Sequence, residues 1–323
     1  MATAVNIRAA DEVIDALAAG AAACRTAACR RGCCDVIAAL PADHVAADQP
    51  GLSGQKLVAT GDLHDNVSHM QAVLSLTGLD DEDRPESDRC HVTFHELIHP
   101  DELHEEPNPA GVGTIPVDYS YRALVRIAAV KAAFPQLVHV LLANHELAQI
   151  AGAGITKGGV NVVKAFNTGV ERVFGPKAGA VSRALGEFIS ALPLALRIVG
   201  GARDGRDILC CHSLPSPELI DRFDYGVLDR DLTEDDYAPR RGSAHLMVWG
   251  RAQDAACIET LADKWNVGTF VLGHEKAEMG FLQTDSRAVV LNTDHQRAHV
   301  AVLDLHKRYD AAGVCAAARP LFG

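Results

Sequence analysis

Side chains of the metal-binding type recur in five short blocks along the chain. In sequence order the blocks are GDLHDN from Gly61, FHELIH from Phe94, ANHE from Ala143, CCHSLPS from Cys210 and LGHEKAEMG from Leu272. Carboxylates, imidazoles and amide carbonyl oxygens are the ligands of hard and borderline divalent metals, and two ions about 3.5–4 Å apart can share one carboxylate. Each block alone is weak evidence, but the ordered set supplies the mixture of ligands that a pair of metals needs.

Each block follows a short β-prone run that ends abruptly. The runs are Lys56 to Thr60, Cys90 to Phe94, Leu137 to Leu142, Ile208 to Cys211 and Gly268 to Leu272. Helical stretches, such as residues 121–133 and 254–264, separate several of the runs, which predicts an α/β domain. Ligands of such domains gather in the crevice outside the carboxyl ends of the strands. We therefore expect the five blocks to converge on one crevice.

The five blocks resemble, in the same order, those of the calcineurin-like metallophosphoesterases, and most closely those of the serine/threonine protein phosphatase branch. The resemblance runs from about residue 58 to residue 305, through motifs of the GDxHGN, GNHE, HGGLSP and GH types. Trp249 falls where that branch often has Leu-Trp, and Lys276 stands where most of the superfamily has a second His. The fold that this resemblance implies is a two-sheet β-sandwich flanked by helices.

The resemblance also implies the site and its reaction. Two divalent metal ions (Mn, Fe or Zn) would be held by six ligands: Asp62, His64, Glu96, Asn144, His212 and His274. The first three would hold one ion, and Glu96 would share in holding the second with the last three. A hydroxide bridging the metals would attack a phosphate ester, most simply a monoester, while His145 protonates the leaving oxygen. The position of Arg251 and Lys276 makes them candidates for binding the substrate.

The second block departs from the GDxxDRG pattern of the family. Its best placement is HELIHPD, which puts Glu96 in the place of the metal-bridging Asp, one methylene longer. His99 then stands where a second Asp orients the catalytic His, and Pro100 stands where an Arg binds phosphate. A bridging carboxylate is thus kept, whereas an orienting carboxylate and a bidentate cation are lost.

Two other functions compete with a phosphatase. The string from His95 to His99 is a literal HExxH, which on a helix binds zinc in metalloproteases. Its local sequence is β-prone, and Pro100 would clash with a helical carbonyl, so we expect no helix there. The second alternative is a catalytically degenerate phosphatase fold that acts as a binding protein, since the Arg and the second Asp are missing.

Composition restricts the partners. The 323 residues carry a net charge of −12 and no basic stripe, so we expect a phosphorylated protein or small molecule as the substrate and no nucleic acid. The sequence has no apolar run of membrane-spanning length and no leader signal, so we expect a cytoplasmic protein that does not bind membranes. The oligomeric state is left open.

The N-terminal part of the chain is predicted to be helical. Residues 1–40 are rich in Ala and are followed by a connector from Pro41 to Gly54, so we divide the chain into a helical extension and connector (1–54) and a catalytic domain (55–323). Four of the nine cysteines, Cys24, Cys29, Cys33 and Cys34, are expected to be reduced and to act as small apolar residues of this helical part. Residues 100–117 are expected to form an acidic loop that selects substrates.

Overall fold

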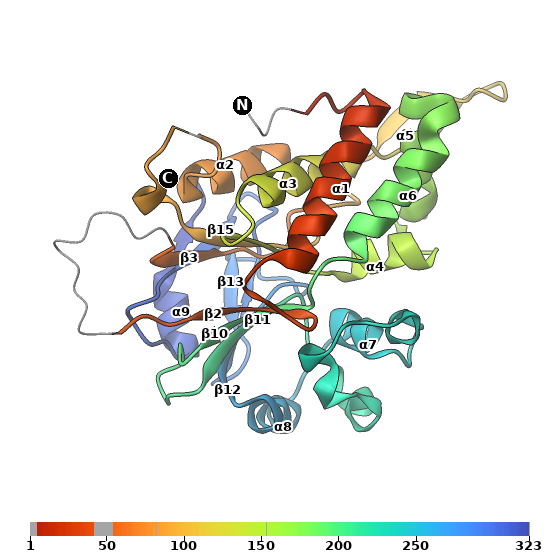
Figure 1. Cartoon of the computed structure of the whole chain (residues 1–323). Helices are drawn as coiled ribbons and strands as arrows, with labels where there is room; N and C mark the ends of the chain where they lie inside the picture. The colour runs from red at the N-terminus through yellow and green to blue at the C-terminus, as the bar shows by residue number, and fades with distance from the viewer. Residues whose placement is uncertain (1–4, 42–53, 82, 153, 323) are drawn as a thin grey trace.

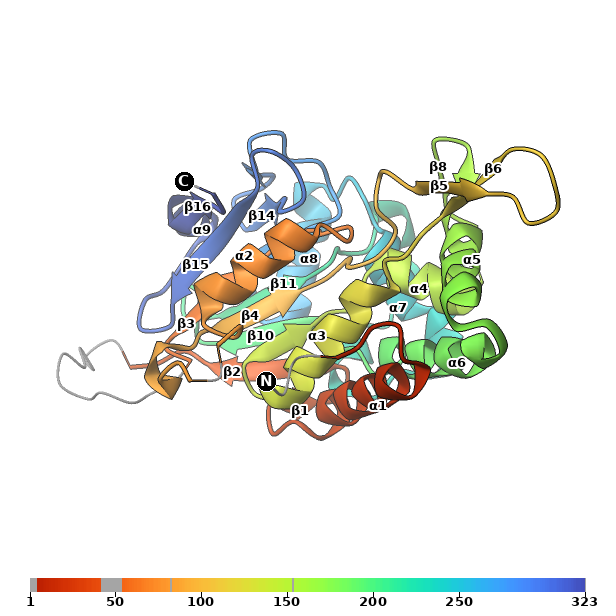
Figure 2. The ribbon, with the colours of Figure 1, turned by 90° about the horizontal axis from the view of Figure 1, so that it is seen from above.

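Two β-sheets pack face to face and helices cover the outside (Figures 1 and 2). The computed structural model describes residues 5–41, 54–81, 83–152 and 154–322. Apart from its ends, the expected connector therefore lies outside the described residues. The larger sheet has seven strands in the order β1 (Arg30–Arg31), β2 (Cys34–Ala38), β10 (Ala195–Val199), β11 (Asp207–Cys211), β12 (Val267–Leu272), β14 (Ala288–Leu291) and β13 (Phe281–Gln283). The smaller sheet has five, in the order β16 (Ala318–Pro320), β15 (His299–Asp304), β3 (Lys56–Ala59), β4 (His91–Phe94) and β7 (Val138–Val140).

Alternating side chains along the strands build the sandwich. On β11, Ile208 and Cys210 belong to the cluster between the sheets, whereas Leu209 and Cys211 belong to the cluster under the helices. Strand β3 alternates in the same way, with Leu57 facing the other sheet and Val58 facing the helices. Both faces of these strands are apolar because both are covered, which explains why the sequence shows continuous apolar runs there.

Helices cover the outer faces and one end of the sandwich. They are α1 (Ala10–Thr26), α2 (Val67–Thr77), α3 (Tyr121–Ala133), α4 (Asn144–Ala151), α5 (Val162–Phe174), α6 (Ala178–Ile189), α7 (Ser243–Trp249), α8 (Ala255–Trp265) and α9 (Ala311–Ala317). Short 3-10 turns are η1 (Glu86–Asp88), η2 (Gly175–Lys177), η3 (Pro217–Arg222), η4 (Tyr225–Asp229) and η5 (Glu234–Tyr237). Helices α2 and α3 lie over the smaller sheet in Figure 2, and α8 packs on β12 of the larger one. Among the described residues no helix is both long and apolar enough to cross a membrane.

The prediction that residues 1–40 are helical is correct for α1 and wrong for the part after it. Strand β2 pairs in parallel with β10 and so joins the larger sheet. Asp35 on β2 is buried and lies 2.7 Å from His139 Nδ1 on β7, which links the two sheets. Cys34 therefore lies on a strand, and Cys29 and Cys33 flank β1. All nine cysteines are free, as predicted. The boundary at residue 54 remains a prediction.

The insertion at residues 100–117 is also more regular than a loop. It contains the antiparallel hairpin of β5 (His104–Pro107) and β6 (Thr114–Val117). Arg172 of α5 holds the hairpin through its Nη1, 2.8 Å from Glu106 Oε2. A second small hairpin, β8 (Thr156–Lys157) with β9 (Val160–Asn161), precedes α5, and Figure 2 shows both hairpins near the same end of that helix.

Candidate dimetal site

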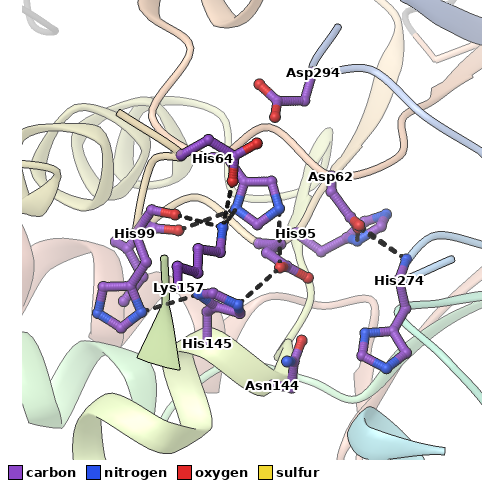
Figure 3. A network of polar contacts seen from close by, with 12 residues as sticks. Asp62, His64, His95, His99, Asn144, His145, Lys157, His274 and Asp294 are labelled. Carbon is purple, nitrogen blue, oxygen red and sulfur yellow. Dashed lines mark hydrogen bonds and ion pairs between the residues drawn. The ribbon is translucent and has the colours of Figure 1, made fainter. Parts of the chain in front are cut away.

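The five sequence blocks meet where the parallel strands of both sheets end. Strands β3, β4 and β7 run parallel in one sheet, and β11, β12 and β14 run parallel in the other. A bridge between Asp62 and Asn292 joins the two sheets beyond the ends of β3 and β14. The six predicted metal ligands and His145 all lie on the segments that follow these strands, and their side chains come together as expected. Figure 3 labels Asp62, His64, Asn144, His145 and His274 among them.

Glu96 stands at the centre of this cluster. Its Oε1 lies 3.1 Å from His64 Nε2 and 3.3 Å from His145 Nε2, and its Oε2 lies 2.9 Å from His212 Nε2. One carboxylate thus faces two groups of ligand atoms, His64 with His145 on one side and His212 with His274 on the other. A carboxylate that bridges two metals would occupy such a position, and the Glu side chain, one methylene longer than Asp, reaches it.

The ligands predicted for the second ion lie close together around one atom, His212 Nε2. Asn144 Oδ1 lies 2.7 Å and His274 Nδ1 3.0 Å from it, in addition to Glu96 Oε2. Asn144 is the first residue of α4 and its side chain does not cap the helix, whose N-cap is Ala143. Since the capping role is absent, the amide oxygen of Asn144 is left to face the cluster.

His95 belongs to the cluster although it was not predicted as a site residue. Its Nδ1 lies 3.1 Å from His212 Nδ1 and 3.3 Å from Asp62 Oδ1, and its Nε2 lies 2.9 Å from the carbonyl oxygen of Thr60. Asp62, His95 and His212 form a further group of possible metal ligands. The sequence signal was its place directly before Glu96, where the family pattern has Gly and where it was considered only as part of HExxH.

The backbone of the site is held in unusual conformations. Of the eight described non-glycine residues with positive φ, five lie here: His64, Asp65, Glu96, His99 and His274. Each such residue costs about 1–3 kcal/mol and persists only where its surroundings enforce it. Gly273 leaves room for this packing, because a Cβ there would lie 2.3 Å from His95 Cε1 and 2.4 Å from Asp62 Oδ1. The turns therefore aim several side chains at one point at the expense of local stability.

The charges of the cluster favour a cation. Burial raises the pKa of the Asp62 carboxyl, but His212 and His95 outweigh this and hold it well below its usual range. Burial opposes protonation of His212, yet Glu96 and Asp62 raise its pKa to about 10. Burial lowers the pKa of His274 to about 3. Glu96 and Asp62 thus stabilise positive charge at His212, and a divalent ion bound between these carboxylates would be stabilised in the same way.

The donor set fits a pair of divalent metals. His274 Nε2 is buried and has no hydrogen-bond partner within the described part of the chain. Buried polar atoms of this kind are rare unless a ligand or metal satisfies them. The donors are carboxylate, imidazole and amide oxygen, which suit Mn, Fe or Zn. The predicted ligands could hold the two ions as the sequence suggested, with His95 as an additional donor beside Asp62.

His145 lies beside the cluster and is held by His99. The Nδ1 atoms of the two rings are 3.0 Å apart, and His99 Nε2 lies 3.2 Å from Gln149 Oε1. Burial lowers the pKa of both imidazoles to about 3. Glu146, next in the sequence, accepts a hydrogen bond from the Leu97 amide at 2.7 Å and so fixes the loop that carries Glu96.

The predicted substrate-binding cations differ in their placement. Arg251 donates through Nη1 to the carbonyl oxygen of His274 at 2.9 Å, which brings a guanidinium to the edge of the cluster. Lys276 is exposed on the loop after His274. Their substrate role remains a prediction. Lys157, which the sequence did not single out, also reaches the site, with its Nζ 3.4 Å from His64 Nδ1.

The HExxH alternative loses its structural basis. Residues 95–99 follow β4 without forming a helix, and both Glu96 and His99 have left-handed backbones. His95 faces His212 and Asp62, whereas His99 faces His145 and Gln149. The two rings therefore do not share one metal in the manner of a zinc protease helix.

Comparison with solved structures identifies the fold. A protein serine/threonine phosphatase from Saccharomyces cerevisiae with similarity to human phosphatase PP5 superposes with a TM-score of 0.61 at 12% identity, over 92% of this chain and 83% of that one. A cold-active protein-tyrosine phosphatase of a psychrophilic Shewanella species gives a TM-score of 0.51 at 13% identity, over 84% and 81% of the two chains. No protein-family model and no curated protein matches the sequence. The comparison of structures thus confirms the predicted two-sheet α/β fold, although the comparisons of sequence find no match.

Proposed function

We propose that the chain is a phosphoester hydrolase with two divalent metals at the cluster around Glu96. The observation that carries the proposal is the position of this carboxylate, whose two oxygens face separate groups of nitrogen and oxygen donors. The fold shared with two protein phosphatases supports the proposal independently of the donor chemistry. A single zinc site would not need a carboxylate in this central place.

Two divalent ions at these donors would neutralise charge on a phosphoryl group and lower the pKa of a bound water towards neutrality. His145 is placed to handle the proton of the leaving group, since its Nε2 faces the cluster beside Glu96. Arg251 would add a positive charge on the side of His274. Burial of Glu96, His212 and His274 excludes water from the centre and strengthens these interactions.

The substrate class that we propose is a phosphate monoester, either a phosphoserine or phosphothreonine side chain or a small molecule. We propose manganese as the first metal to try, because the ligand set mixes hard carboxylate and amide oxygens with imidazoles. Nine free cysteines suit a reducing compartment, and we place the protein in the cytoplasm on that basis.

The test is elemental analysis of chain purified without chelator, together with p-nitrophenyl phosphate hydrolysis before and after addition of Mn. About two metals per chain with hydrolysis supports the proposal. About one zinc without hydrolysis contradicts it and returns attention to a mononuclear site. A chain that takes up no metal and hydrolyses nothing is a binding protein on a phosphatase fold, the degenerate alternative.

A further inference from the structure

Lys157 reaches the metal cluster from outside the five sequence blocks. It lies on β8, in the short hairpin that precedes α5, and its Nζ donates to the carbonyl oxygen of His99 at 3.0 Å. The same Nζ lies 3.4 Å from His64 Nδ1 and 2.9 Å from Asp101 Oδ1. Figure 3 shows the side chain extended towards His64, between His99 and His145. A hairpin outside the sheets therefore delivers a cation to the edge of the site.

The cations around the cluster are few. Among the described residues, Lys157 and Arg251 are the Lys and Arg side chains whose contacts reach the metal-type residues, Arg251 through His274 and Lys157 through His64 and His99. Figure 3 places His274 and Lys157 at different sides of the cluster. A phosphate ester carries negative charge on several oxygens, and contacts from two sides would hold it more firmly than one contact.

We propose that Lys157 binds the phosphate group of the substrate at the side of the site formed by His64 and His99, a conclusion that rests on the proposed function. The Lys157 amino group donates to the carbonyl oxygen of His99, the residue before Pro100. It therefore places positive charge beside Pro100, which has neither a charge nor a backbone N–H group. The Lys157 side chain is 25% exposed, so it is held in place and still open to a ligand. Lysine binds phosphate as a point charge and needs no bidentate geometry.

Asp101 is the anion that Lys157 holds in the structure. Its side chain is 74% exposed, and exposed ion pairs of this kind are weak. A phosphate that also contacts the metals would therefore displace Asp101 from Lys157 at little cost. Asp101→Asn should accordingly strengthen phosphate binding, whereas weaker binding in this variant would count against the exchange.

The test measures binding of inorganic phosphate to the metal-loaded full chain by calorimetry, with metal content determined on the same samples. Lys157→Met is expected to weaken phosphate binding about tenfold or more, and Lys157→Arg to keep it within about threefold of the unaltered chain. Lys164→Met, on the exposed face of α5, is the matched control and should change nothing. Unchanged phosphate affinity in Lys157→Met overturns the proposal, and so does loss of metal in that variant, because Lys157 would then only support His64.

Hydrolysis of p-nitrophenyl phosphate separates this inference from the proposed function. Suppose that the unaltered chain hydrolyses the ester and that Lys157→Met binds phosphate with the same affinity as the unaltered chain. The role of Lys157 is then refuted, and the proposed phosphatase function is supported. If the chain hydrolyses no ester but its phosphate affinity depends on Lys157, the phosphatase is refuted and the anion site stands. If the metal-loaded chain binds no phosphate at all, Lys157 has no such role.

Discussion

His99 and His145 face each other through their Nδ1 atoms at 3.0 Å. Gln149 Nε2 donates to Asn167 Oδ1 at 2.7 Å, which turns its carbonyl oxygen towards His99 Nε2. His99 Nε2 then donates, and its Nδ1 is left to accept the proton of His145 Nδ1. A neutral imidazole, fixed by an amide, thus orients His145 at the position where the family that the sequence resembles is expected to have a carboxylate.

The first prediction concerns this pair of histidines. His99→Ala should lower kcat by about 10²-fold while metal content stays the same, because His145 loses the partner that sets its tautomer. His99→Asp should restore most of the rate, since a carboxylate can accept the same proton. Steady-state hydrolysis of p-nitrophenyl phosphate with metal analysis measures both. An unaltered kcat in His99→Ala would show that His145 does not depend on His99.

The second prediction separates the metal ligands from His145, for which we propose a role in proton transfer to the leaving group. Asp62→Asn and His274→Ala should lower metal content and hydrolysis together, because each removes a donor of the cluster. His145→Ala should lower kcat by about 10²–10⁴-fold and keep its metals. The readout is metal per chain beside kcat for each variant. If His145→Ala loses metal, His145 is itself a metal ligand. The three residues His64, Glu96 and His145 would then bind one ion together.

The third prediction concerns Asp118, which is fully buried next to the insertion. Burial raises the pKa of its carboxyl to about 6, although hydrogen bonds from Ser120 oppose the shift, and its Oδ2 has no partner within the described residues. The folded pKa lies above the unfolded value, so ionisation opposes folding, and this cost grows as the pH rises from about 4 to about 6. Above that range it amounts to about 2–3 kcal/mol.

Asp118→Asn should therefore raise the Tm at about pH 8 and change it little at about pH 4. The Asn oxygen can still accept from the Ser120 amide, which Asp118 Oδ1 does at 2.7 Å. Thermal unfolding followed by circular dichroism at both pH values measures the difference. Asp221→Asn, an exposed acid on η3, is the control and should show no such dependence. A Tm gain of equal size at both pH values would show that the carboxylate is not the cause.

Much of the fold and site could be predicted from the sequence because strand ends carry a local signal. An apolar run that stops at Gly-Asp or Gly-His places Asp62 and His274 at a carboxyl end, whichever sheet the strand joins. The ligand set itself was implied by the resemblance of the five ordered blocks to the metallophosphoesterases. That there are two sheets follows only from the family resemblance. The division into seven and five strands was not predicted, since period and length do not tell which strands pair.

The misses share a different cause, which is dependence on distant contacts. The Ala-rich run around Cys34 favours a helix by propensity, yet it becomes β2 because pairing with β10 buries it. Lys157 lies in a short polar segment with no motif, and only the fold brings it to His64. His95 lay in a motif that fits two families, and its true neighbour, His212, is far away in the sequence.

The last prediction tests the acidic hairpin as a selector of substrates. His104 pairs with Val117 at its base, so replacing residues 105–116 by Gly-Gly closes the hairpin with a two-residue turn and keeps both ends in place. The deletion removes Glu105 and Glu106, whose charges repel phosphate-rich ligands near the site. We expect the rate on polyphosphorylated esters to rise relative to p-nitrophenyl phosphate, with unchanged metal content. The ratio of kcat/KM values over a panel of esters is the measurement.

A second variant checks that the hairpin acts through its charge. Arg172→Leu removes the guanidinium that donates to Glu106 Oε2 at 2.8 Å and to the carbonyl oxygen of Pro107 at 2.6 Å. It removes these two hydrogen bonds between α5 and the hairpin and leaves the acidic residues of the hairpin in the chain. The ratio is expected to change in the opposite direction to the deletion, because Glu106 loses its counter-cation and then repels phosphate-rich ligands more strongly. Identical ratios in the deletion, in Arg172→Leu and in the unaltered chain would mean that the hairpin does not select substrates.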